Sequence, residues 1–240
     1  MRRLAAIALL LACSAAHAWA QAPAFRSEAH AGNSSGNSLT ITKPAGVVQD
    51  DVLVAFIAWE DDMTPTPPTG WTLKGSVTES ATFSGYFWWK RATASEPADY
   101  TFDKGGPARW RTGTIMAYSG AITSGDPVDV FSSNSETVAD TTVECLSITT
   151  TVDDTAIVAL GGNKNGAANW TPPTGMTERV DFSAPISTAD VAQATAGVSG
   201  EKVFTAPSSS EDVSFLLALK PPAGAPPPRN RAVVISRLLP

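Results

Sequence analysis

The sequence of 240 residues predicts an all-β protein, an antiparallel two-sheet β-sandwich of jelly-roll type built from two similar half-units. Three observations predict this fold. Short apolar or alternating segments recur along the chain, bounded by Pro, Gly, Asp or Thr, which is typical of sandwiches and jelly rolls. No segment has the periodicity of an amphipathic helix of normal length. An internal repeat relates the two halves of the chain.

The first twenty residues predict a secretory signal peptide. Arg2 and Arg3 form a basic start, residues 4–12 are apolar, and two small-x-small cleavage sites lie within residues 16–20. We therefore expect a secreted protein, periplasmic or extracellular, without a transmembrane segment, because the apolar run is too short to span a bilayer. A lipobox-like sequence before Cys13 leaves lipid anchoring open as the less favoured alternative.

The predicted domain occupies residues 21–220, and its strands are recognised by β-branched, aromatic or continuously apolar composition. In order, the predicted strands are 39–42, 52–59, 83–90, 99–102, 112–118, 143–149, 156–160, 189–194 and 213–219. Residues 221–240 form a Pro-rich linker and C-terminal tail. The apolar segment 232–235 in this tail offers an edge through which the protein could oligomerise.

The internal repeat divides the domain into two equivalent halves. The segment Thr-Pro-Pro-Thr-Gly-Trp-Thr at 66–72 recurs as Thr-Pro-Pro-Thr-Gly-Met-Thr at 171–177. An aspartate pair opens the apolar strand before each copy, at 50–51 and at 153–154. Each half is too small to bury both of its faces, so we expect the halves to close into a single sandwich in which 51–59 and 154–160 are equivalent central strands.

Features that occur in both halves are expected to serve the scaffold. The Pro-Pro-Thr-Gly segments predict turns, and Trp71, which is matched by Met176, is expected in the core. The aspartate pairs are interpreted as turn caps, with calcium binding as a weaker alternative. Cys145 is the only cysteine after residue 20, so we expect a buried thiol and no internal disulfide.

Features that occur only in the first half are candidates for function. Alignment of the halves places Trp89, Ile115 and Ala117 toward the core, and Trp88 with Met116 on the opposite, exposed face. Rings on such a face could stack on sugars, and nearby carboxylates could accept hydrogen bonds from hydroxyl groups. The competing interpretation places these rings beneath a loop or against another subunit. The predicted ligand-binding residues are Trp59, Glu60, Asp61, Asp62, Tyr86, Trp88, Trp110 and Tyr118.

Charge and composition exclude several functions. Without Arg2 and Arg3, 15 of the 17 basic side chains stand against 23 acidic ones, so nucleic acid is not an expected partner. His30 is the only histidine after residue 20, which excludes a zinc site built from several His and Cys ligands. We expect no cofactor and no metal. Two carboxylates suffice for a glycosidase, and the candidates are Glu60, Asp61, Asp62, Asp126, Asp129 and Glu144.

Four motifs together resemble a group of secreted bacterial and phage-associated β-sandwich domains. They are TPPTGW at 66–71, ATASEP at 92–97 followed by YTF at 100–102, AYSG at 117–120 and DPVD at 126–129. The resemblance covers roughly residues 25–220, and the C-terminal tail departs from it. It implies a role in binding or surface display and supplies no catalytic residue.

The sequence therefore predicts a secreted, non-catalytic module that binds carbohydrate or another cell-surface polymer. One alternative is a polysaccharide-active hydrolase or lyase that uses carboxylates near Glu60. The other alternative is a structural subunit of an extracellular or phage-like assembly.

Overall fold

The structure is a computed structural model, and it describes residues 21–33, 36–80, 82–103, 105, 109–165, 169–182 and 185–222. The predicted signal peptide and residues 223–240 of the tail lie outside the described residues. Within the described ranges the regular structure consists of strands, and no helix there could cross a membrane. The predicted antiparallel β-sandwich is confirmed.

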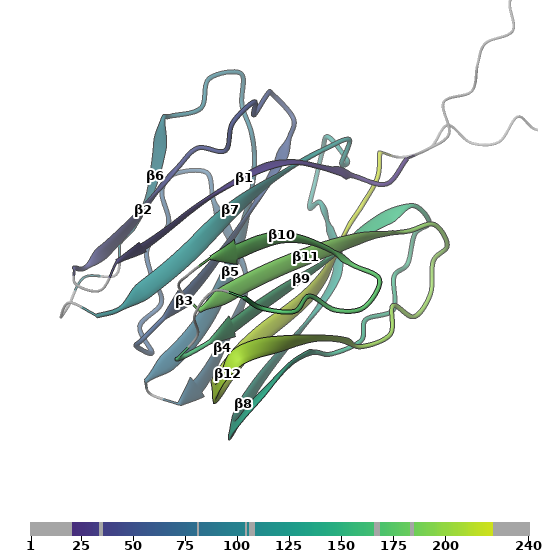
Figure 1. The fold of residues 1–240 in the computed structure, drawn as a ribbon. Coiled ribbons are helices and arrows are strands. Elements are labelled where there is room, and N and C mark those ends of the chain that lie inside the picture. The colour runs from purple at the N-terminus through teal and green to yellow at the C-terminus, as the bar shows by residue number, and fades with distance from the viewer. Residues whose placement is uncertain are drawn as a thin grey trace, which may run out of the picture.

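Each half of the chain supplies one five-stranded sheet, and the two sheets face each other (Figure 1). In spatial order, the first sheet contains β1 (Ala24–Asn33), β7 (Arg111–Ser119), β3 (Val52–Trp59), β5 (Phe83–Arg91) and β4 (Thr72–Ser80). The second sheet contains β8 (Val128–Cys145), β12 (Lys202–Leu219), β9 (Thr155–Asn163), β11 (Ile186–Gln193) and β10 (Thr177–Phe182). The two orders match when the strands of each sheet are numbered separately in chain order, so the repeat duplicates the whole five-stranded sheet. As predicted, β3 and β9 are the equivalent central strands.

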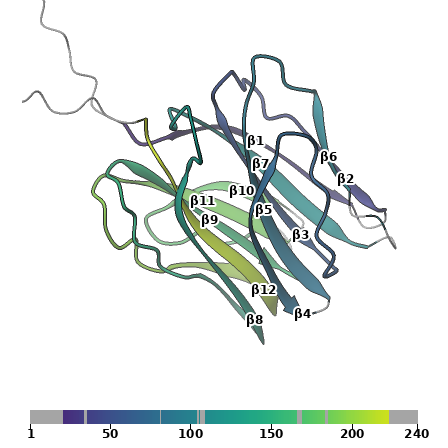
Figure 2. The same cartoon turned by 180° about the vertical axis from the view of Figure 1, so that it is seen from behind.

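A two-stranded flap covers the outer face of each sheet. The first flap pairs β2 (Ser38–Thr42) with β6 (Asp99–Asp103), on the side of the first sheet that faces away from the second sheet (Figures 1 and 2). The second flap pairs residues 142–145 of β8 with residues 202–205 of β12, because both long strands extend beyond the second sheet. The molecule therefore has four layers instead of the two that the sequence predicts.

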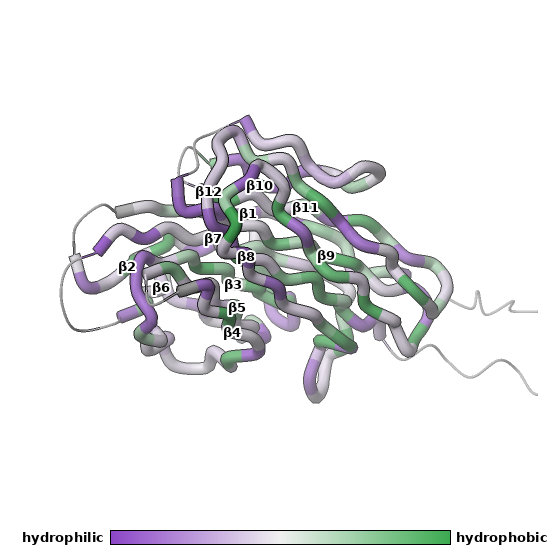
Figure 3. Tube along the Cα trace, turned by 90° about the horizontal axis from the view of Figure 1, so that it is seen from below, coloured by the Kyte–Doolittle hydropathy of each residue, from purple (hydrophilic) through white to green (hydrophobic). Residues whose placement is uncertain are grey.

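Apolar side chains fill all three spaces between the layers. Figure 3 shows that hydrophobic residues are concentrated along the central strands. The space between the sheets contains Phe56 of the first half and Phe215 of the second, whose ring centroids lie 6.1 Å apart. Every residue of β3 is buried, and the same is true of β9. A strand buried on both faces has no polar side, so its sequence does not alternate.

The turns that the repeat predicts have matching backbone conformations in the two halves. Gly70 and Gly175 have φ angles of 89° and 81°, a region that glycine adopts without a steric penalty. Asp50 and Asp154 also have positive φ angles, at 70° and 55°. The side chain of Asp51 accepts hydrogen bonds at this turn, including one of 2.9 Å from the backbone N–H of Val48. Trp71 is buried, as expected.

Trp89 faces the second sheet as predicted, but Trp88 is not exposed. The ring of Trp89 is half-buried against the core between the sheets. Trp88 points to the opposite face, where its side chain is completely buried beneath the first flap. Its ring centroid lies 5.2 Å from that of Phe102 in β6. The prediction of an exposed Trp88 was wrong because two additional strands cover this face.

The predicted faces of β7 are reversed in the structure. Met116 and Tyr118, expected on the outer face, lie in the core between the sheets. Ile115 and Ala117, expected toward that core, pack beneath the first flap. All four residues are completely buried.

A shift of one residue between the halves explains this reversal. Val52 and Ala156 each follow the positive-φ aspartate by two residues, and they pair with Tyr118 and Leu219 respectively. Tyr118 therefore corresponds to Leu219, and the expected equivalence of the two strands is off by one position. Because side chains alternate along a strand, a shift of one residue exchanges its faces.

Candidate functional site

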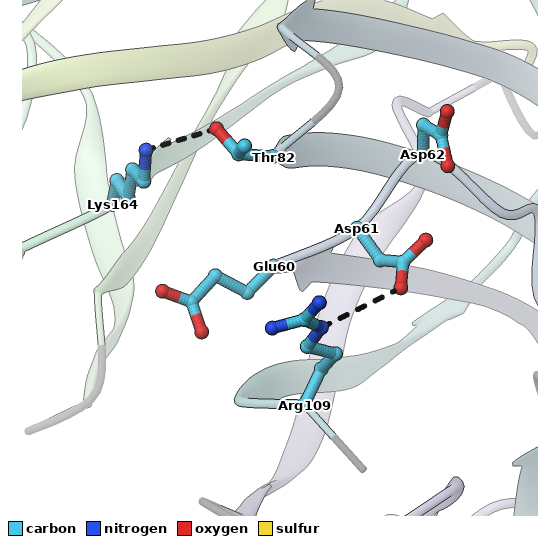
Figure 4. A pocket seen from close by; sticks show the side chains of 6 residues that line it. All are labelled: Glu60, Asp61, Asp62, Thr82, Arg109 and Lys164. Carbon is cyan, nitrogen blue, oxygen red and sulfur yellow. Dashed lines mark hydrogen bonds and ion pairs between the residues drawn. The ribbon is translucent and has the colours of Figure 1, made fainter. Parts of the chain in front are cut away.

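A polar hollow of about 400 Å³ lies at one end of the sandwich (Figure 4). Its described lining includes acidic, basic and hydroxyl side chains and no aromatic ring. The lining residues are Glu60, Asp61, Asp62, Thr82, Arg109 and Lys164.

The hollow lies where the two central strands end. Glu60 directly follows the last residue of β3, and Lys164 directly follows the last residue of β9. The backbone N–H of Glu60 donates to the carbonyl of Trp110 over 3.0 Å, and that of Lys164 donates to the carbonyl of Glu211 over the same distance. Glu60 and Lys164 therefore occupy equivalent positions in the two halves and carry opposite charges.

Lys164 links the two halves at the wall of the hollow. Its Nζ atom lies 2.7 Å from Glu211 Oε2 in the second half and donates to Thr82 Oγ1 in the first half over 3.0 Å (Figure 4). The hydrogen bond from Lys164 lowers the pKa of Glu211. These two contacts hold the ammonium group of Lys164 at the wall of the hollow.

The opposite side of the hollow is formed by Arg109 and by the acidic loop, residues 60–62. The Nε atom of Arg109 lies 3.9 Å from Asp61 Oδ2, and Asp61 Oδ1 accepts the backbone N–H of Met63 over 3.1 Å. Figure 4 shows the side chain of Glu60 extending toward the space near Arg109 and Lys164. In the described part of the chain, no hydrogen bond or ion pair reaches the carboxylate of Glu60 or Asp62. These two carboxylates are available to a ligand.

The aromatic residues predicted to bind a ligand do not form an exposed face. Trp59, Tyr86 and Trp88 are completely buried beneath the first flap. Tyr118 is completely buried on the other side of the first sheet, and Trp110 packs half-buried against the same core. The expected aromatic platform is therefore wrong, because its rings lie on opposite faces of one sheet and are covered there.

Two of these residues contact groups next to the hollow, Trp59 through its ring and Trp110 through its backbone carbonyl. The guanidinium carbon of Arg111 lies 5.1 Å from the ring centroid of Trp59, which is cation–π distance. The same guanidinium donates to the carbonyls of Gly36 and Ser38 and thereby holds the start of β2. Trp110 contributes its carbonyl, which positions the backbone of Glu60.

Tyr118 joins the two halves at the edge formed by β1 and β10. Its hydroxyl donates to Asp190 Oδ2 over 3.1 Å, and Asp190 Oδ1 accepts a hydrogen bond of 2.9 Å from Arg179 Nε. Burial raises the pKa of Tyr118 well above its usual value, and the charge of Asp190 raises it further. Arg179 also lies over the ring of Phe25, 4.4 Å from its centroid. This network stabilises the contact between the sheets and is remote from the hollow.

The remaining candidate carboxylates do not reach the hollow. Asp126 pairs with Lys74 over 2.5 Å, and Asp129 accepts two hydrogen bonds from Thr151. Both aspartates lie in the segment around the start of β8, at the other end of the sandwich. Glu144 lies on the second flap, where the charge of Glu201 raises its pKa. Among the described residues, no three His, Cys, Asp or Glu side chains are arranged to hold a metal ion.

The two ends of the described chain lie at the end of the sandwich opposite the hollow (Figures 1 and 2). Ala24 pairs with Ser119, and the carbonyl of Lys220 accepts the backbone N–H of Ile122 over 3.0 Å, so both ends meet at one turn. The hollow follows the opposite ends of the central strands. The hollow therefore lies far from both ends of the described chain.

Sequence reasoning identified the three acidic residues of the hollow but missed Thr82, Arg109 and Lys164. The repeat of Thr-Pro-Pro-Thr-Gly aligns Glu60 with Asn165, so the equivalence of Glu60 and Lys164 became visible only in the strand ends of the structure. Thr82 and Arg109 come from two other loops, and only the arrangement of the strands brings them to the site. Comparisons with protein-family models, curated proteins and solved structures gave no significant match.

Proposed function

We propose that the protein is a secreted, non-catalytic module that binds a carbohydrate in the polar hollow. The observation that carries this proposal is the unpartnered carboxylate of Glu60, set in a hollow with the fixed ammonium group of Lys164 and the guanidinium group of Arg109. Export rests on residues 1–20, which have the sequence pattern of a signal peptide.

The chemistry of the lining suits a ligand rich in hydroxyl groups. Carboxylates accept hydrogen bonds, guanidinium groups donate them, and a sugar hydroxyl can do both. Such bonds are stronger when one partner carries a charge, as the groups of this lining do. The volume of about 400 Å³ lies in the range of about 300–1,000 Å³ that is usual for small-ligand sites and suits one or two sugar rings.

The position of the hollow supports a role in recognition. A protein attached through either end of its chain would present the hollow outward, because both ends of the described chain lie at the opposite end of the sandwich. The described lining offers charged and hydroxyl groups to a ligand, so we expect binding to depend on hydrogen bonds. We therefore expect modest affinity at a single site, which display of many copies would strengthen.

A glycan array combined with an assay of reducing-sugar release tests this function. Residues 21–240 should bind a subset of glycans and release no sugar from them. Glu60→Gln should weaken binding about threefold to tenfold, since it removes one charged acceptor from a solvated site. The matched control is Glu201→Gln, which changes an exposed glutamate near the opposite end and should bind as the wild type does.

Two outcomes would reject the proposal. Binding to no glycan on the array would remove the proposed ligand class. Sugar release that Glu60→Gln abolishes would instead identify a hydrolase or lyase that uses this carboxylate.

A further inference from the structure

We infer that the hollow selects carbohydrates that carry a free ammonium group, such as amino sugars without an acetyl group. This inference rests on the proposed function, because it specifies the ligand class of the same site. It follows from two observations: the cationic side chains of the described lining have acidic partners, whereas the carboxylates of Glu60 and Asp62 have no cationic partner there.

Each cation of the described lining already has an acidic partner. Lys164 Nζ lies 2.7 Å from Glu211 Oε2, and Arg109 Nε lies 3.9 Å from Asp61 Oδ2. Glu60 has no such partner. Asp62, in the same loop, has none either, so two negative charges of the described lining lack a counter-charge.

An ammonium group matches each of these carboxylates better than other sugar substituents do, and since Figure 4 shows Glu60 and Asp62 pointing in different directions, each would take its own ammonium group. It supplies three donors and a positive charge, whereas a hydroxyl supplies one neutral donor. A carboxylate on the ligand would have to compete with Glu211 for Lys164, and that lysine is also held by Thr82 over 3.0 Å. The lining therefore favours cationic sugars over acidic ones.

The charge of the whole chain acts in the same direction. The formal net charge is −6, and a protein with a negative field attracts cationic ligands over distances longer than a hydrogen bond. This attraction is screened by salt, whereas hydrogen bonds to neutral sugars depend much less on ionic strength. Salt dependence is therefore a separate readout of the inference.

Calorimetric titration of residues 21–240 with four tetrasaccharides tests the inference. The four probes are tetramers of glucosamine, N-acetylglucosamine, glucose and galacturonic acid, measured at slightly acidic pH so that the free amine is charged. The glucosamine tetramer should bind about tenfold tighter than the other three, which corresponds to one added charge-assisted hydrogen bond. Its affinity alone should fall strongly when salt is added.

Two variants locate this preference. Glu60→Gln and Asp62→Asn should each weaken binding of the glucosamine tetramer more than binding of the glucose tetramer, so that the preference falls about threefold. The matched control Glu201→Gln should keep the wild-type preference. Circular dichroism confirms that each variant remains folded.

The possible results distinguish this inference from the proposed function. Equal affinity for the glucosamine and N-acetylglucosamine tetramers, or tighter binding of galacturonic acid, would overturn the inference and leave carbohydrate binding in place. A preference that both variants retain would also overturn it, because the ammonium group would then bind elsewhere. Absence of binding to these tetramers and to every glycan of the array would overturn both proposals.

Discussion

Replacement of Asp212 by asparagine should stabilise the fold at neutral and alkaline pH. Asp212 lies on β12 where this strand passes from the second sheet into the second flap, and its side chain is completely buried. Neither carboxylate oxygen has a hydrogen-bond partner among the described residues. Burial raises the pKa of Asp212 from 3.8 to about 8, and the charges of Glu136, Asp140, Glu144 and Glu79 contribute to this rise.

Proton linkage gives the direction and the size of the effect. The unfolded chain loses the proton of this carboxyl group near pH 4, whereas the folded protein keeps it until about pH 8. The folded state therefore loses stability as the pH rises between these two values. At about 1.36 kcal/mol per pKa unit, a shift of about four units corresponds to at most about 6 kcal/mol. Asparagine has no such proton, so the Asp212→Asn variant avoids this loss.

Urea unfolding followed by tryptophan fluorescence between about pH 4 and pH 9 measures this difference. The variant and the wild type should have similar stability at the acidic limit, and the variant should become more stable by several kcal/mol near pH 8. Asp99→Asn changes an exposed carboxylate on β6 and should follow the wild type at every pH. A variant Asp212→Asn that is no more stable than the wild type near pH 8 would refute the reasoning.

Three further substitutions test the packing of the layers. Trp88→Ala should lower the free energy of unfolding in urea by about 3–5 kcal/mol because its ring is completely buried. Trp89→Ala should lower it less because its ring is partly exposed, and equal losses would contradict the assigned faces. Gly85→Ala should cost about 1–3 kcal/mol because its new carbon would lie 2.9 Å from a side-chain carbon of the second sheet, and an unchanged unfolding midpoint would contradict this close approach. Tyr118→Phe should lower the free energy of unfolding by about 1–3 kcal/mol, since it removes the hydrogen-bond donor to Asp190. An unchanged melting temperature in calorimetry would show that this bond does not stabilise the contact between the two sheets.

The strands and the duplication could be predicted because local sequence signals determine them. Pro-Pro-Thr-Gly predicts a turn wherever it stands, and its two copies at 66–72 and 171–177 indicate that the same unit occurs twice. The apolar segments 52–59 and 156–160 identify the central strands because they are long enough to cross a sheet and contain no polar residue. These signals require no knowledge of distant contacts.

The sequence did not determine which side chains of a strand face the space between the sheets and which face a flap. Alternation fixes the face of a strand only when one side is polar, and both flaps remove that condition. In β7, Met116 and Tyr118 contact one core while Ile115 and Ala117 contact another, so all four are apolar or aromatic and buried. Nothing in the sequence therefore indicated that the alignment of the halves was shifted by one residue in β7, and this shift exchanged the two predicted faces of the strand.

The candidate site was predicted in part for a related reason. Glu60, Asp61 and Asp62 interrupt the repeat directly after a buried strand, which places them in a loop at the end of a sheet. The prediction that Trp88 and Tyr118 accompany them failed because burial under a flap or between sheets leaves no trace in the composition of a single strand.

Backbone amide chemical shifts, followed during titration with the tightest-binding oligosaccharide, test most directly whether the hollow is the binding site. The largest changes should occur at residues 60–63, at Thr82, at Arg109 and at Lys164, which lie together at one end of the sandwich. Glu60→Gln should reduce these changes at equal ligand concentration. Changes confined to the turn at 119–127, at the opposite end, or no change at saturating ligand would contradict a binding site in the hollow.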